Sequence, residues 1–162
     1  MIVKVICDAA VLIGLAKIDR LDLLRKLYGN IYIPWAVYQE VVVRGGKRPG
    51  VEEIDRAKWI KKIKVKDRAA VNLLVSELGQ GESEVLLLGK ELKADLLILD
   101  DSRARAAGIS AGFRIVGLAG LLLLAKKRDL IQSIKPLFEE LIDKNFRLSQ
   151  KIIQTILEKA DE

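Results

Sequence analysis

Two acidic positions follow directly after apolar, strand-like runs of the chain. The run from Ile2 to Cys7 leads into Asp8, and the run from Leu96 to Leu99 leads into Asp100 and Asp101. Ligands of open α/β sheets bind just outside the carboxyl ends of parallel strands, so carboxylates far apart in the chain can converge there. The chain has no histidine and one cysteine. Converging carboxylates would therefore bind a hard cation such as Mg²⁺ or Mn²⁺ through oxygen.

Two further acids have positions that suit the same site. Glu82 lies just inside the start of a predicted helix, where the backbone dipole favours an anion and Gly79 and Gly81 allow close approach. Glu40 lies on the segment after the second predicted strand. A cluster of such carboxylates repels itself unless a cation neutralises it, and a bound metal would activate water for attack on a phosphodiester.

Each of these acids also has an ordinary structural interpretation. Asp is a common helix N-cap, and acids in the first helical turn stabilise the helix dipole. Residue types and spacing alone therefore indicate an anionic site on an α/β sheet and leave the reaction open.

The elements that position these acids alternate along the chain. Strands are predicted at 2–7, 31–33, 59–65, 95–99 and 113–116. Helices are predicted at 11–28, 35–43, 51–58, 70–77, 82–92, 101–111, 117–128, about 133–144 and 148–160. Such alternation predicts parallel βαβ units. The β-branched run 37–43 would also suit a strand, so the helix at 35–43 has an alternative.

Composition limits the kind of protein and its partners. With 162 residues, 51% of them hydrophobic, the chain is long enough for one domain with a core. Its longest apolar run, 116–125, is much shorter than the ~20 residues that span a bilayer, and its start lacks the pattern of a signal peptide. We expect a soluble, cytoplasmic protein with no membrane association. An acidic site on a chain with net charge +6 suits an anionic polymer.

A series of motifs in order along the chain indicates a family. The motifs are Asp8-Ala9-Ala10-Val11-Leu12-Ile13-Gly14-Leu15-Ala16-Lys17, Leu21-Asp22-Leu23-Leu24, Ile31-Tyr32-Ile33-Pro34, Val37-Tyr38-Gln39-Glu40-Val41, Leu78-Gly79-Gln80-Gly81-Glu82-Ser83-Glu84, Leu97-Ile98-Leu99-Asp100-Asp101-Ser102-Arg103-Ala104-Arg105 and Val116-Gly117-Leu118-Ala119-Gly120-Leu121-Leu122. Together they resemble PIN-domain proteins, specifically the prokaryotic VapC-toxin-like branch. The resemblance covers nearly the whole chain.

The resemblance implies a fold and an activity. The fold would be a three-layer α/β sandwich with a central parallel sheet of about five strands flanked by helices. We assign residues 1–130 to this domain and 131–162 to a C-terminal helical extension packed on it. The implied activity is metal-dependent cleavage of single-stranded RNA with Mg²⁺ or Mn²⁺. Many relatives are toxins of toxin–antitoxin pairs, which implies an antitoxin partner and a homodimer.

The resemblance also implies the site residues. The four acids of the family fall on Asp8, Glu40, Glu82 and Asp100 as catalytic residues. The metal would be held by Asp8, Asp100 and Glu82, with Asp101 assisting or replacing Asp100, and Glu84 is the alternative to Glu82. Basic residues beside these acids are the predicted RNA contacts, namely Arg44, Lys47, Arg48 and Arg103, while Arg105 would either join them or neutralise a site carboxylate. Trp35 and Trp59 would either stack on bases or pack in the core.

The chain departs from the family pattern at Ala9, Ala10 and Leu118, where relatives carry hydroxyl side chains near the site. Such hydroxyls orient a carboxylate or a metal-bound water, and their loss typically costs about 10- to 100-fold in metal affinity or activity. The alternative function is therefore a catalytically degenerate PIN-like module that binds RNA or a protein partner. A phosphatase of the haloacid-dehalogenase type would need a second Asp two residues after Asp8, where Ala10 stands.

Overall fold

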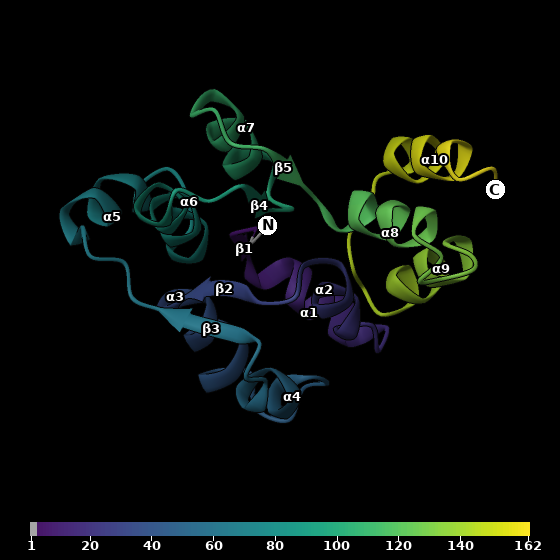
Figure 1. Cartoon of the computed structure of the whole chain (residues 1–162), viewed down its shortest axis with the longest axis horizontal. Helices are drawn as coiled ribbons and strands as arrows, with labels where there is room; N and C mark the ends of the chain where they lie inside the picture. The colour runs from purple at the N-terminus through teal and green to yellow at the C-terminus, as the bar shows by residue number, and fades with distance from the viewer. Residues whose placement is uncertain (1–2) are drawn as a thin grey trace.

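A single parallel sheet organises the computed structural model, which describes residues 3–162 (Figure 1). Its strands are β1 (Val5–Cys7), β2 (Ile31–Pro34), β3 (Ile60–Ile63), β4 (Leu96–Ile98) and β5 (Ile115–Val116), in the order β3-β2-β1-β4-β5. Each neighbouring pair is parallel. The predicted α/β fold with a central five-stranded parallel sheet is confirmed.

The strand order reverses at β1, which pairs with β2 on one side and with β4 on the other. In the register of β1 and β4, Cys7 lies opposite Ile98. Asp8 and Asp100 therefore leave the same edge of the sheet on adjacent strands. This edge is the topological switch point, where open α/β sheets bind their ligands.

Helices cover both faces of the sheet. Their bounds are α1 (Ala9–Lys17), α2 (Asp22–Tyr28), α3 (Trp35–Tyr38), the π-helical turn η1 (Gln39–Val43), α4 (Val51–Arg56), α5 (Arg68–Val75), α6 (Gln80–Leu92), α7 (Ser102–Ser110), α8 (Leu118–Lys127), α9 (Lys135–Asp143) and α10 (Gln150–Lys159). Helices α5 and α6 lie on one side of the sheet, while α1, α2 and α8 lie on the other (Figure 1). The layers enclose a core in which β1 is fully buried, including the free thiol of Cys7.

Two predicted elements differ from the structure. The helix predicted at 11–28 is two helices, because Asp19 adopts a left-handed φ of 54° and the Arg20 N–H returns to the Leu15 carbonyl at 2.9 Å. This geometry ends α1, and α2 starts anew. The strand predicted at 2–7 begins at Val5, and its Ile2 lies outside the described residues. The ambiguous run 37–43 is helical, as α3 and η1.

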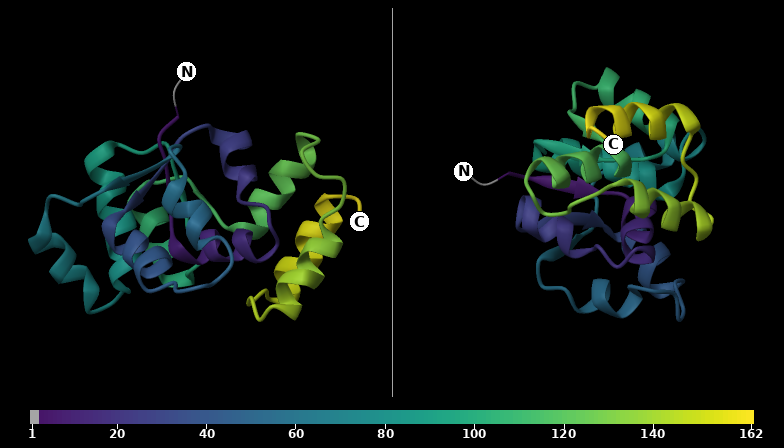
Figure 2. Two further views of the ribbon diagram at one scale, coloured as in Figure 1. Left: turned by 90° about the horizontal axis from the view of Figure 1, so that it is seen from below. Right: turned by 90° about the vertical axis from the view of Figure 1, so that its right-hand side faces the viewer.

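The C-terminal helices gather at one end of the molecule (Figure 2), where α10 packs on α8. Lys17 Nζ donates to the Lys144 carbonyl at 2.8 Å, and Lys144 Nζ donates to the Lys17 carbonyl at 2.6 Å. This reciprocal pair joins the ends of α1 and α9.

A second attachment is made by Glu162, just beyond α10. Its carboxylate accepts hydrogen bonds from the backbone of Ile134 and Lys135, from the Ser133 hydroxyl and from Lys126 Nζ. These bonds hold the end of α10 against the start of α9. Among residues 3–162, no helix is long and apolar enough to cross a membrane.

Candidate active site

Asp8 links the ends of two strands through its carboxylate. It is the N-cap of α1, where Oδ1 accepts a hydrogen bond from the Val11 N–H at 2.9 Å. Its Oδ2 accepts from the backbone N–H of Asp100 at 3.0 Å, across 92 residues of sequence. The residue is only 2% exposed. Both the capping and the site interpretations therefore apply to the same side chain.

Asp100 extends this connection to β5. Its Oδ1 accepts from the Leu118 N–H at 2.9 Å, at the start of α8. Gly117 makes the approach possible, because a Cβ at this residue would lie 2.6 Å from Asp100 Oδ1 and would also collide with the Arg105 guanidinium. A carboxylate, a guanidinium and the glycine backbone thus meet above the carboxyl ends of β4 and β5.

The electrostatics of this pair favour a bound proton or cation. The pKa of Asp8 is raised from 3.8 to about 7: burial contributes most, the charges of Asp100 and Glu82 add to the rise, and the N–H groups of Asp100 and Val11 oppose it. Burial also raises the pKa of Asp100, against the lowering effects of the Leu118 N–H and the Arg105 charge. Removal of water and mutual repulsion are the conditions under which carboxylates gain from a cation.

Glu82 and Glu40 stand at the margin of this pair. Glu82 lies in the first turn of α6, and its carboxylate is folded back onto Gly79, where a Cβ would collide with Oε2. Glu40 is exposed on η1; partial burial and the Glu82 charge raise its pKa, while Arg44 and Arg48 lower it. Single π-helical turns inside helices often occur at functional sites. The four acids thus form one electrostatically coupled group.

The donor atoms suit Mg²⁺ or Mn²⁺, although the side chains are not closed around a metal position. In residues 3–162, no three acidic or cysteine side chains are arranged as a ready metal site. The carboxylate of Glu82 is instead folded back onto Gly79, the N-cap of α6. Asp8 offers a buried carboxylate and Asp100 a half-buried one, each with lone pairs left for a cation. Glu82 lines the same cleft as Asp100 and is near enough for its charge to raise the pKa of Asp8. The chemistry of the donors therefore fits the metal.

The structure gives separate positions to the two reserve acids. Asp101 is the N-cap of α7, with Oδ1 accepting from the Ala104 N–H at 2.9 Å, and it is exposed beside Asp100. Glu84 is 2% exposed, and its carboxylate accepts from the Ala36 N–H, from Gln80 and from Arg68. Glu84 therefore fastens α3 to α6, whereas Asp101 remains free to face solvent with its second oxygen.

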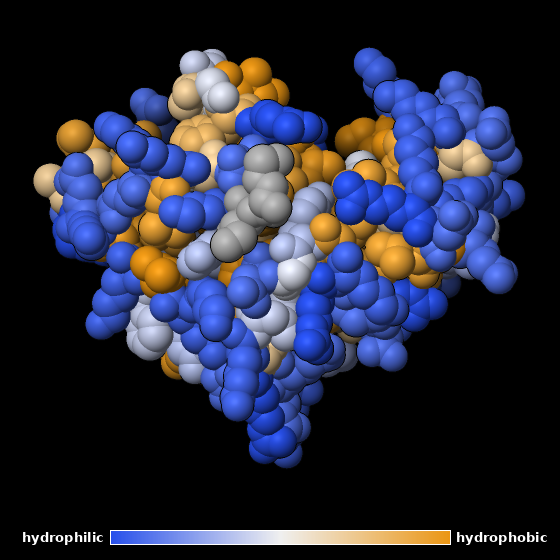
Figure 3. Space-filling model, in the orientation of Figure 1, coloured by the Kyte–Doolittle hydropathy of each residue, from blue (hydrophilic) through white to orange (hydrophobic). Residues whose placement is uncertain are grey.

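A cleft of about 800 Å³ opens from the acids toward the C-terminal helices. Glu82, Asp100, Asp101 and Arg105 line it on one side, and residues of the 146–156 segment line it on the other. Figure 3 shows the molecule hollowed between the part that carries α7 and the part that carries α10. Ala10, one of the positions without a hydroxyl, also opens onto this cleft.

The predicted RNA-contacting residues lie mostly outside the cleft. Arg44 and Arg48 stand on the Glu40 side of the acids, close enough to lower the pKa of that carboxyl. Lys47 and Arg103 are exposed, and neither lines the cleft. Sequence reasoning missed the 146–156 wall, because an amphipathic helix pattern does not tell which surface the helix docks on.

In a comparison with protein families, a family model described as a PIN domain, DUF3368, matches residues 4–162. This match covers nearly the whole chain, including the C-terminal helices. The chain belongs to the PIN-domain family. The PIN domain is a nuclease fold, and the acids of this PIN domain stand at the switch point of its sheet. No curated protein matches the chain.

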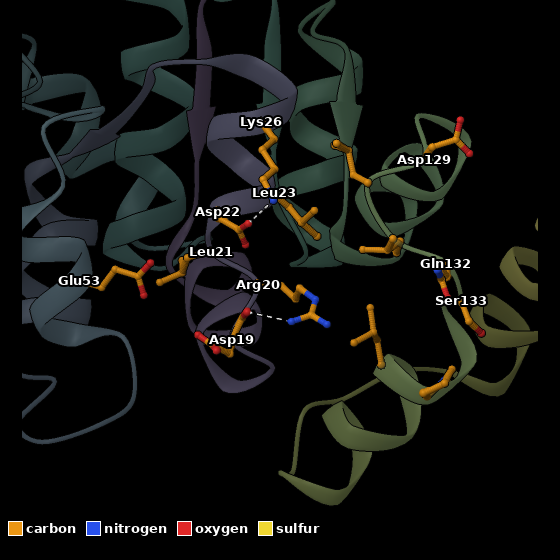
Figure 4. A pocket seen from close by; sticks show the side chains of 14 residues that line it. Asp19, Arg20, Leu21, Asp22, Leu23, Lys26, Glu53, Asp129, Gln132 and Ser133 are labelled. Atoms are coloured by element: carbon orange, nitrogen blue, oxygen red, sulfur yellow. Dashed lines mark hydrogen bonds and ion pairs between the residues drawn. The ribbon is translucent and has the colours of Figure 1, made fainter.

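This PIN domain has a second cavity of about 790 Å³ at the other end of α1 (Figure 4). Its polar lining includes Asp19, Asp22 and Glu53, and the Asp22 carboxylate pairs with Lys26 at 2.7 Å. Because α1 has nine residues, this cavity begins about 14 Å along the helix from the Asp8 end. It therefore lies away from the carboxyl ends of the strands and from the candidate site acids.

Proposed function

We propose that this PIN domain is a metal-dependent endoribonuclease that cleaves single-stranded RNA. One observation supports this most: at the switch point of a PIN-domain sheet, the buried carboxylate of Asp8 accepts a hydrogen bond from the backbone N–H of Asp100, whose half-buried carboxylate lines an open cleft. Buried and mutually repelling carboxylates suit a divalent cation, and a cation of this kind suits a phosphodiester.

Each acid has a role in this proposal. Asp8, Asp100 and Glu82 would hold Mg²⁺ or Mn²⁺, and Asp101 would assist from the helix start. When bound, the metal supplies Lewis acidity to the phosphate and lowers the pKa of water. Glu40, whose pKa is raised mainly by partial burial, accepts the proton from the attacking water. Phosphate contacts come from Arg44, Lys47, Arg48 and Arg103.

The test uses purified protein, mixed single-stranded RNAs and Mn²⁺. Cleavage that disappears with EDTA and in the Asp8→Asn variant supports the proposal. Asp67→Asn is the matched control, because Asp67 is also a helix N-cap but lies at the exposed start of α5. Cleavage that persists unchanged in Asp8→Asn would exclude the proposed site.

A second candidate function is a degenerate module of the same fold that binds RNA or a protein partner without cleaving it. It is favoured by the alanine side chains at positions 9 and 10 and by the open arrangement of the acids. Ala10 opens onto the cleft, whereas Ala9 is buried, so Ala10→Thr is the informative substitution. A tenfold or larger gain in cleavage would show that a missing hydroxyl limits the enzyme.

The biological role follows from the family resemblance. We infer that the nuclease is the toxin of a toxin–antitoxin pair, that it binds an antitoxin protein and that it forms a homodimer. Light scattering of the purified protein tests the dimer. Co-expression with the product of a neighbouring small gene tests the antitoxin: suppression of RNA cleavage by a copurifying partner supports the pair, and undiminished cleavage contradicts it.

A further inference from the structure

We infer that the 146–156 segment is the second wall of the RNA-binding cleft and that Arg147 and Lys151 contact the phosphates of a single strand. This inference rests on the proposed function, because it assigns the substrate path of the same site. It gives the C-terminal helices a role in binding.

The two walls of the cleft differ in charge. One wall carries the acids of the proposed metal site, and the opposite wall presents Arg147 and Lys151. A metal ion at the acids would neutralise the phosphate next to it. The neighbouring phosphates of the strand need a positive charge from elsewhere. Basic side chains facing the acids across the cleft supply it, as backbone contacts in nucleic-acid interfaces do.

Both cations are available for a ligand. Within residues 3–162, the ion pairs and side-chain hydrogen bonds include neither Arg147 nor Lys151. By contrast, Lys126 pairs with Glu162 and Lys144 donates to the Lys17 carbonyl, and the exposed Lys135 and Lys159 lie outside the cleft lining. Arg105, on the acid side, already stands near Asp100.

The apolar part of the lining suits bases. Side chains from β5 and from the 146–156 segment form it, with Phe146, Leu148 and Ile152 on the second wall. Ile152 is 45% exposed. The flat faces of unpaired bases can cover such side chains, and stacking on Phe146 does not depend on base identity. A duplex hides its base faces, so this lining favours a single strand.

The second wall is held in position before any ligand binds. Glu162 fixes the end of α10, and the Lys17–Lys144 pair fixes the turn before residue 146. The cleft volume of about 800 Å³ lies within the range of ~300–1,000 Å³ that is usual for ligand sites. Because the wall is already ordered, little conformational entropy is lost there when RNA binds.

The test compares two double variants of equal charge change. Arg147→Ala with Lys151→Ala removes the cleft cations, and Lys135→Ala with Lys159→Ala removes two exposed lysines outside the cleft. Binding of a labelled single-stranded RNA is measured in EDTA, between 50 and 200 mM salt. The slope of log K against log salt should fall by about 1.4 for two phosphate contacts on a single strand. The wild type then loses about sevenfold more affinity over this range than the cleft variant does.

The lysine control should keep the wild-type slope, and thermal unfolding should show that both variants are folded. Equal slopes for the two double variants, or a wild type that does not bind the RNA, would overturn the inference. Its failure is distinct from failure of the nuclease proposal. A protein that binds RNA through the cleft but does not cleave with Mn²⁺ supports the wall and contradicts the nuclease. A protein that cleaves RNA with Mn²⁺, but whose two double variants have equal salt slopes, supports the nuclease and contradicts the wall.

Discussion

Replacing Asp8 with Asn should change how the stability of the metal-free protein depends on pH. Burial raises the pKa of Asp8 from 3.8 in the unfolded chain to about 7 in the folded protein. The folded state therefore binds more protons than the unfolded state between these values. The stabilising proton is fully present below pH 3.8 and is lost as the pH rises through 7, so the wild type loses stability over this interval.

The size of the effect follows from the two pKa values. Relative to low pH, the folded state loses ~2 kcal/mol of stability at pH 5, where Asp8 is ionised in the unfolded chain and still protonated in the folded protein, and ~4 kcal/mol at pH 8. Asn does not ionise. The free energy of unfolding of the Asp8→Asn variant, relative to that of the wild type, should therefore rise by about 2 to 3 kcal/mol from pH 5 to pH 8. The Asn amide also places a donor against a backbone N–H, which costs about 1–3 kcal/mol, but this cost is the same at both pH values and cancels.

The assay is urea unfolding in EDTA at pH 5 and pH 8, with the wild type, Asp8→Asn and Asp67→Asn. Asp67 caps α5 through the Ala70 N–H at 3.0 Å, as Asp8 caps α1 through Val11, but its side chain is exposed. Asp67→Asn should keep the same difference from the wild type at both pH values. If Asp8→Asn also shows no change beyond about 0.5 kcal/mol, Asp8 does not carry a burial-shifted charge and the electrostatic argument for the site is wrong.

Four further predictions concern the site and its surroundings. Saturating Mn²⁺, at 100 times its Kd, should stabilise the wild type by about 3 kcal/mol and leave Asp8→Asn unchanged in thermal unfolding, and equal stabilisation of both would place the metal elsewhere. Gly117→Ala should lower the rate of RNA cleavage by about 100-fold in a protein with normal circular dichroism, since a Cβ displaces Asp100 and Arg105; normal cleavage rates would show that this contact does not set the site geometry. Glu84→Gln should cost about 1–3 kcal/mol in urea unfolding with little loss of cleavage per folded molecule, because its carboxylate fastens Ala36 and Gln80. Glu82→Gln should have the opposite effects, with little loss of stability and a large loss of cleavage. If both variants lose stability and cleavage alike, Glu84 is not purely structural and Glu82 is not purely a site residue.

The meeting of Asp8 and Asp100 was predictable, because it depends on strand ends in a parallel sheet. Both runs are apolar, both end in an acid, and a parallel sheet brings such ends to one edge. In the structure, Cys7 pairs with Ile98, which places Asp8 and Asp100 at the same edge of the sheet, as the sequence pattern predicted. The start of α9 was predictable from a local signal: the helix expected at about 133–144 has Pro136 in its first turn, where the missing proline N–H breaks no helical hydrogen bond.

Other features depend on interactions that no local pattern encodes. The break between α1 and α2 uses Asp19 in a left-handed conformation, which glycine usually provides. The orientation of Glu82 depends on the space above Gly79. The wall formed by residues 146–156 depends on where α10 docks, and this docking is fixed by distant partners such as Lys126. Tertiary contacts, rather than helix or strand propensity, decide all three.

The hydrogen bond from Asp100 to Asp8 also sets when the site can exist during synthesis. A ribosome that has released the first 95 residues has made Asp8 and Glu82 but not the partner strand, and the connection spans 92 residues. The α8 N–H that holds Asp100 and the 146–156 segment emerge later still. The candidate site therefore assembles only after almost the entire polypeptide has been translated.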